Sequence, residues 1–243
     1  MPCLGDRARP CRPRVSAPRE KIRNMADPTG VYLEVGSKRV FAGALDWPGW
    51  CRSGNTAEDA LETLASYHPR YAVVAKRAGL AFPRRLADDF AVVEEIAGTG
   101  TTDFGAPDKV AGRHRTPLSA AEAKREVKLL RATWAVFDDV VAGSPAELRK
   151  GPRGGGRDRD KMVGHVLESE ASYARSIGVK LKPPAIDDRA AIEELRDAIA
   201  EVLGQPSTGQ VERGWPPRYA AARIAWHVLD HAWEMQDRAD PGG

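Results

Sequence analysis

The segment Ile224-Ala-Trp-His227-Val-Leu-Asp-His231-Ala-Trp-Glu234 decides how the C-terminal half of the chain folds. Its apolar residues recur with helical spacing, and the preceding Pro216 and Pro217 suit a first helical turn, where a missing N–H costs nothing. His227 and His231 lie one above the other on such a helix, so both imidazoles can reach one ion. Histidine pairs of this spacing also occur as satisfied core residues, so the pair alone leaves both interpretations open.

Three further amphipathic segments precede this helix. Their apolar residues fall at alternating spacings of three and four, which is the pattern of helices that bury one face. The expected helix starts are the capping box of Ser119 and Glu122, a cap at Asp158 or Asp160, and a cap at Asp187. Four such helices, joined by one long crossover and shorter links, predict an all-α four-helix bundle over residues 118–238.

His165 strengthens the metal interpretation. It lies on the apolar face of the second predicted helix, and a buried histidine needs a polar partner. A bundle can bring it opposite His227 and His231. Three neutral nitrogen ligands without a thiolate leave one coordination position open, which is the pattern of catalytic zinc sites. The ligand type favours zinc, with nickel as the second choice.

Several residues around these histidines have two interpretations. The carboxylates of Glu168, Asp230 and Glu234 are either acceptors for an imidazole N–H or part of a solvated helix face. The tryptophans at 226 and 233 are expected to pack against other helices. The Gly-rich loop that carries Arg153, Arg157 and Arg159 is either a solvated connection or a binding loop for an anionic cofactor.

The N-terminal part predicts an α+β domain over residues 31–97. Alternating apolar residues indicate strands at 31–35 and 40–45, and residues 90–96 supply another strand. Pro48 and Gly49 indicate a bulge or bend after the second strand. Thr56 caps a helix that Pro69 breaks or restarts. The order is β-β-α-β, and residues 98–117 have the composition of a linker. His114 in that linker is expected to be solvated.

Composition and charge narrow the function classes. The chain has 42% apolar and 29% charged residues, as in ordinary globular proteins, and has neither a secretory signal nor a membrane-length apolar run, so a cytoplasmic location is expected. Residues 1–24 hold seven Lys or Arg against two acids, although the whole chain has a net charge of only +3. The body is therefore nearly neutral, and nucleic acid is not an expected partner.

The ends of the chain and its cysteines add three expectations. Residues 1–30 are interpreted as a disordered basic tail, with Met25 as the working start, and residues 239–243 as a second tail. The three cysteines have no CxxC spacing, which argues against a disulfide framework and a thiolate zinc site.

The stretch from Phe41 to Ala60, with its Asp-Trp-Pro-Gly, Gly-Asn-Thr and Glu-Asp-Ala elements, resembles the HicB-like fold. In HicB antitoxins such a domain accompanies a DNA-binding module and contacts a toxin. The chain contains no ribbon-helix-helix or helix-turn-helix pattern, so a structural or oligomerising role is expected here. An antitoxin-like partnership with RNA or a toxin is the weaker alternative.

The helix Asp-Lys-Met-Val-Gly-His165-Val-Leu-Glu-Ser-Glu, followed by His227-Val-Leu-Asp-His231, resembles the DinB superfamily over about 120 residues. That superfamily includes mycothiol-dependent enzymes of actinobacteria. The resemblance implies a metal held by His165, His227 and His231, and a metal-dependent thiol S-transferase or isomerase, or a hydrolase using metal-activated water. Its partners would be a small-molecule substrate, a low-molecular-weight thiol and a second copy of the chain. The alternative is a non-catalytic metal-binding or partner-binding protein.

Overall fold

The computed structural model describes residues 28–83, 90–150 and 156–239. Its strands are β1 (Thr29–Val35), β2 (Val40–Ala44), β3 (Cys51–Gly54) and β4 (Phe90–Ala97). Its helices are α1 (Ala57–Ser66), α2 (His68–Arg77), α3 (Gly100–Phe104), the 3-10 helix η2 (Gly112–Arg115), α4 (Ala120–Gly143), α5 (Arg159–Arg175), α6 (Arg189–Leu203) and α7 (Pro217–Ala239). An α+β region is therefore followed by a helical one, as predicted. None of these helices combines the length and apolar character needed to cross a membrane.

The four strands form one mixed sheet in the order β3-β2-β1-β4. Strand β2 pairs antiparallel with both β1 and β3, as short connections require. Strand β4 pairs parallel with β1, because the chain first crosses over through α1 and α2. The inner strand β1 is buried through its first six residues, so the sheet shares its core with the helices that cover it.

The N-terminal order differs from the predicted β-β-α-β. Residues 45–50 form a tight connection rather than a bulge within one strand, and Gly49 supports it with φ of +90°. The amide of Ala44 donates to the carbonyl of Trp50 at 2.9 Å, which brings β3 back alongside β2. Pro69 restarts the helix as expected, since it occupies the first turn of α2.

Residues 98–117 contain α3 and η2 and are anchored to the sheet. The buried carboxylate of Glu34 accepts hydrogen bonds from the amides of Asp108 and Lys109, and Glu94 accepts from the amide of Gly112. These bonds place His114 under the sheet, where it is only 2% exposed. The expectation that His114 is solvated is therefore wrong, because tertiary hydrogen bonds decide its position.

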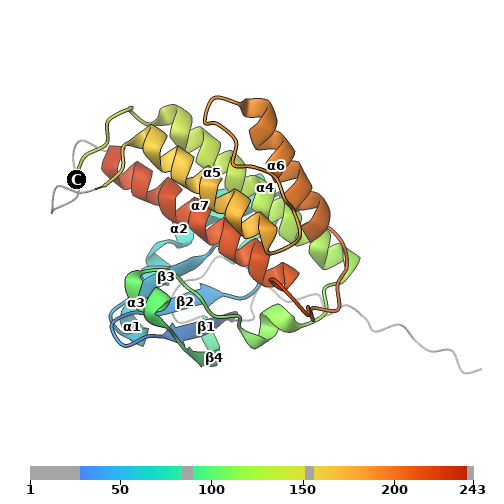
Figure 1. Ribbon diagram of the computed structural model, residues 1–243. Coiled ribbons are helices and arrows are strands. Elements are labelled where there is room, and N and C mark those ends of the chain that lie inside the picture. Colours follow the sequence, from blue (N-terminus) through green and yellow to red (C-terminus); the bar gives the residue numbers. More distant parts are fainter. Residues whose placement is uncertain (1–27, 84–89, 151–155, 240–243) are drawn as a thin grey trace, which may run out of the picture.

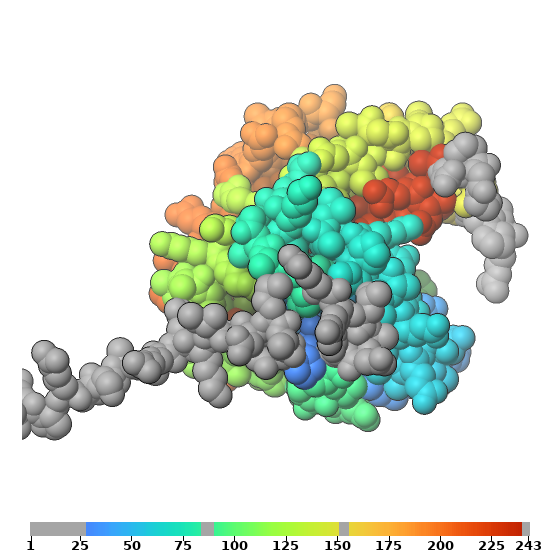
Figure 2. Space-filling model, turned by 180° about the vertical axis from the view of Figure 1, so that it is seen from behind, coloured from blue at the N-terminus to red at the C-terminus, as the bar shows by residue number. Residues whose placement is uncertain are grey.

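The four long helices pack side by side, and α7 lies nearest the sheet (Figure 1). Seen from behind, α2 lies against the helical region (Figure 2), where it contacts α4. One continuous hydrophobic core extends from Val31 in the sheet through Leu64 of α1 to Phe137 and Trp233. The two regions thus bury apolar surface against each other and contribute to one core.

The helix starts follow their capping residues closely. Thr56 and Ser119 both form complete capping boxes, as predicted. Helix α6 is capped by Asp188, which accepts from the amide of Ala191 at 3.0 Å, and not by Asp187. Asp158 precedes α5, but its carboxylate accepts from the amide of Leu148 and from Lys150 instead of capping the helix.

Candidate metal centre

Three histidines meet between α5 and α7. His227 and His231 stand one turn apart on α7, and His165 faces them from α5. Each offers one nitrogen, and these three nitrogens all lie within 4.8 Å of one another. The ring centroids are separated by 4.7 to 5.1 Å. The sequence prediction that these residues converge is confirmed, and they lie close enough to hold a metal ion.

Helix packing explains the convergence. The apolar residues that flank His165 on α5, Met162 and Val166, are fully buried in the core, so α5 is held in one rotation against α7. His227 and His231 are 6% and 8% exposed, whereas His165 is only half-buried. The cluster therefore has a closed side within the core and a side open to solvent at His165.

Glu234 orients His231. Its Oε2 lies 3.1 Å from His231 Nδ1, and its Oε1 accepts from Arg238 Nη1 at 2.9 Å. A carboxylate only accepts, so Nδ1 carries the proton and Nε2 is left as the ligand atom. The hydrogen bond from His231, together with the hydrogen bond and charge of Arg238, lowers the pKa of Glu234. The carboxylate therefore stays ionised at neutral pH.

Two of the imidazoles are held in the neutral form that binds metal. Burial, followed by the neighbouring His231 and His165, lowers the pKa of His227 to about 2. Burial also lowers the pKa of His165, with smaller contributions from Arg157 and His231. His227 Nδ1 is buried and has no hydrogen-bond partner among the described residues. The lowered pKa values of His165 and His227 and the unpaired buried nitrogen of His227 fit a divalent cation, which needs deprotonated imidazole ligands.

The other candidate acceptors do not reach the cluster. Asp230 points toward the sheet and forms an ion pair with Arg52 at 2.7 Å, so its expected role beside a histidine is not found. Glu168 is exposed on α5, which agrees with the solvated alternative. Arg238 was not singled out from the sequence, although its spacing of four from Glu234 is the ordinary signal of a helical ion pair.

The predicted binding loop is only partly described. Arg153 lies outside the described residues. Arg157 is exposed, and its charge lowers the pKa of both His165 and His227, so it lies on the same side as the cluster. Arg159 donates to Asp160 and to the carbonyl of Ser144, contacts that join α5 to the end of α4. Arg157 is therefore, with Arg223, one of two described arginines whose charge acts on His227.

The two tryptophans beside the histidines contact the N-terminal region. Trp226 packs edge-on against Phe41 of β2, and Trp233 packs against Tyr67 between α1 and α2. The expectation that they pack against other helices holds for Trp233, whereas Trp226 contacts a strand and lines a cavity, because the sheet lies on the opposite side of α7 from α5. Both indoles help to hold α7 in the orientation that presents His227 and His231 to His165.

Comparisons with family models, with curated proteins and with solved structures find no match for this chain, so its chemistry is inferred from the site itself.

Proposed function

We propose that the chain is a metal-dependent enzyme in which His165, His227 and His231 hold one divalent cation, with zinc favoured over nickel. The observation that carries the proposal is the set of three imidazoles whose nitrogens lie within 4.8 Å of one another, two of them buried in the core and His165 half-buried. Three neutral ligands leave the full charge of the cation uncompensated and one coordination position free. This is the arrangement of catalytic rather than structural zinc.

The reaction we propose is transfer or isomerisation that uses a low-molecular-weight thiol as the nucleophile. When bound, the cation would lower the pKa of a thiol at the free position and supply a thiolate near neutral pH. The thiol rests on the resemblance to the mycothiol-dependent DinB proteins. Glu234 orients His231, and the charge of Arg157 favours an anionic group on the open side.

Metal content is the first test. The purified full chain should carry about one equivalent of zinc or nickel by plasma mass spectrometry, as expected for a single three-histidine site. The His227→Ala/His231→Ala variant should carry none. His68→Ala is the matched control, because His68 bonds the carbonyl of Pro83 away from the cluster and its loss should leave the metal in place. A metal-free wild-type protein, prepared without chelator, would refute the ligand assignment.

Thiol binding is tested separately. Adding N-acetylcysteine to cobalt(II)-loaded wild-type protein should change the visible absorption of the ion, and serine of equal concentration should not. A protein that binds one cobalt ion but gives no response to thiols would favour hydrolysis or the non-catalytic alternative. If the cobalt absorption responds to the thiol, turnover assays with thiol acceptors are the next experiment.

A further inference from the structure

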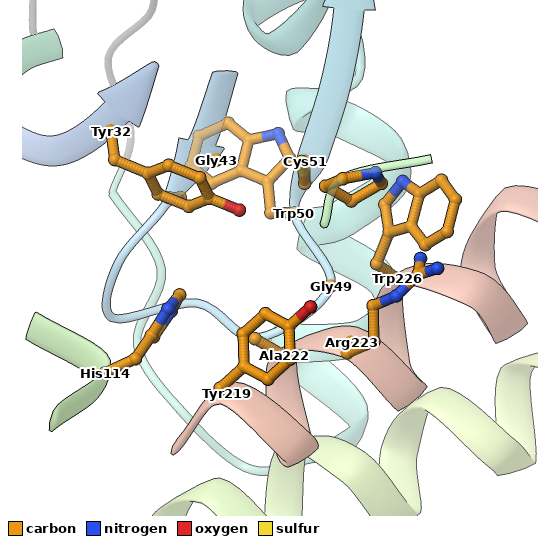
Figure 3. A pocket seen from close by; sticks show the side chains of 12 residues that line it. Tyr32, Gly43, Gly49, Trp50, Cys51, His114, Tyr219, Ala222, Arg223 and Trp226 are labelled. Carbon is orange, nitrogen blue, oxygen red and sulfur yellow. The ribbon is translucent and has the colours of Figure 1, made fainter. Parts of the chain in front are cut away.

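A small cavity lies between the sheet and the side of α7 that faces it. It is lined by Tyr32 of β1, Cys51 of β3, His114 of η2, and Tyr219, Arg223 and Trp226 of α7. Figure 3 shows these side chains around a common hollow, with the two tyrosine hydroxyls directed toward its interior. None of these residues belongs to the histidine cluster, so the cavity is a separate site.

Three nitrogen atoms at this cavity have no hydrogen-bond partner among the described residues. They are His114 Nδ1, Arg223 Nη1 and Trp226 Nε1. His114 is 2% exposed and Trp226 is 5% exposed. Buried polar groups are almost always paired, and guanidinium and indole nitrogens can only donate. The cavity wall therefore holds buried donors that no described protein group accepts from.

The charge at the cavity is positive. No carboxylate lines it, and Arg223 has no ion pair within the described part of the chain. The guanidinium of Arg223 is held over the rings of Trp226 and Tyr173, with its carbon 4.6 and 5.2 Å from their centroids. Glu34, a nearby acid, is already bonded to Thr102 and to backbone amides. The guanidinium charge is thus left without a counterion at the cavity.

The remaining polar groups do not neutralise this charge. Burial raises the pKa of the Cys51 thiol to about 12 and that of Tyr219 to about 12, and it raises the pKa of Tyr32 as well. All three groups are therefore protonated and uncharged at neutral pH. The hydroxyl of Tyr219 already donates to the carbonyl of Asp108, and Tyr32 and Cys51 share a hydrogen bond with each other, so the unpaired nitrogens of the wall are those of Arg223, Trp226 and His114.

Size limits the ligand. The cavity has a volume of about 20 Å³, which excludes a large molecule and leaves room only for a small ion or the end group of a ligand. We propose that this cavity binds a small anion, a carboxylate group or an ion of similar size, which accepts hydrogen bonds from Arg223 and Trp226. A planar carboxylate suits the guanidinium fork best. The source is either a free small anion or the end of a longer carboxylic acid. This inference does not depend on the proposed function.

Thermal unfolding of the full chain tests the proposal. Formate should raise the melting temperature of the wild-type protein by mass action. In Arg223→Gln the apparent affinity for formate should fall about tenfold or more, because a charge-assisted hydrogen bond is lost. The matched control is Arg131→Gln, which removes an exposed arginine paired with Asp197 and should respond like wild type. Equal responses of all three proteins would overturn the proposal.

A second variant and a direct observation test the site even if Arg223→Gln does not fold. Trp226→Phe removes the indole N–H, keeps a ring against Phe41, and should also weaken the formate response. A crystal soaked in bromide should show an anomalous peak in the cavity beside Arg223. A cavity without bromide, in a protein whose stability is insensitive to formate, holds water instead and refutes the anion site. If longer carboxylates bind more tightly than formate, the ligand is the end of a larger carboxylic acid. If they bind more weakly, the ligand is a free small anion. Either result supports the site.

Discussion

The two polar sites on the two sides of α7 are built in different ways. The histidine cluster takes its three imidazoles from two helices, and two of them are four residues apart. The cavity between the sheet and α7 takes Tyr32, Cys51, His114 and Arg223 from four elements spread over the chain. Helical periodicity reveals a site of the first kind, whereas only the packed fold assembles one of the second kind.

The two sites also depend on different physical supports. The imidazoles are held by helix rotation and by the Glu234–His231 hydrogen bond, which are local features of α5 and α7. The cavity depends on how closely the β2–β3 connection approaches α7, where Gly49 lies against Ala225 and Leu229. A substitution that disturbs the contact between Gly49 and α7 should therefore affect stability and the cavity more than the histidine cluster.

The largest expected effect comes from Gly49→Ala. A Cβ at this position would lie 2.9 Å from Ala225 Cβ and 2.9 Å from Leu229 Cδ1, on a backbone with φ of +90°. Strain and overpacking together should lower the free energy of unfolding by about 3 kcal/mol or more. Urea unfolding measures it. The control Gly143→Ala adds a Cβ with nothing within 4 Å and should change stability by less than about 1 kcal/mol.

The metal content of Gly49→Ala tests whether the histidine cluster is independent of the cavity on the other side of α7. We expect folded Gly49→Ala protein to keep its bound metal, because none of the three ligands lies on the β2–β3 connection. Loss of metal from protein whose circular dichroism is unchanged would mean that the two sides of α7 are coupled.

The next effect concerns His114 and pH. Burial lowers its pKa from 6.5 to about 4, so the unfolded chain binds a proton more readily than the folded one between these values. Stability should therefore fall as pH drops from 7 to 5, by about 2 kcal/mol for this residue. His114→Phe keeps a ring against Tyr32 and Tyr219, and its unfolding curves should lose this part of the pH dependence. A variant with wild-type pH dependence would contradict the assignment.

A smaller effect is expected for Glu234→Ala at the histidine cluster. Removal of the acceptor for His231 Nδ1 frees the ring and lowers its basicity, which should weaken metal binding by about 10- to 100-fold. Competition with a zinc indicator measures the affinity. Asp230 lies one turn before Glu234 on α7, but it pairs with Arg52. The metal affinity of Asp230→Ala should therefore match that of the wild-type protein. Equal losses in both variants would point to a general effect of helix charge.

The smallest effect should come from Ser119→Ala, which removes the capping box of α4. Loss of such a cap costs about 1 kcal/mol of stability, seen as a shift of the urea midpoint. Helix α4 contributes no residue to the histidine cluster, so the metal content should be unchanged. A stability equal to that of wild type would show that Glu122 and Arg218 hold this helix end without the serine.

Much of the helical region could be predicted because its signals are local. The apolar stripes, the capping boxes at Thr56 and Ser119, and the spacing of His227 and His231 all act within one or two turns. The errors have a common origin. Strand β3 was missed because a four-residue strand has little periodicity of its own, and the cap at Asp188 instead of Asp187 is a choice between adjacent similar residues.

The sequence by itself determined the α+β then helical order, the capping boxes at Thr56 and Ser119, and the three histidines as a set, since periodicity and capping are short-range effects. Only the tertiary structure decided that Glu234 rather than Asp230 orients a histidine, that His114 is buried, and that unpaired donors meet beside Arg223. Each of these outcomes depends on which side of α7 faces the sheet. That orientation is set by the shared burial of apolar surface from segments far apart in the chain.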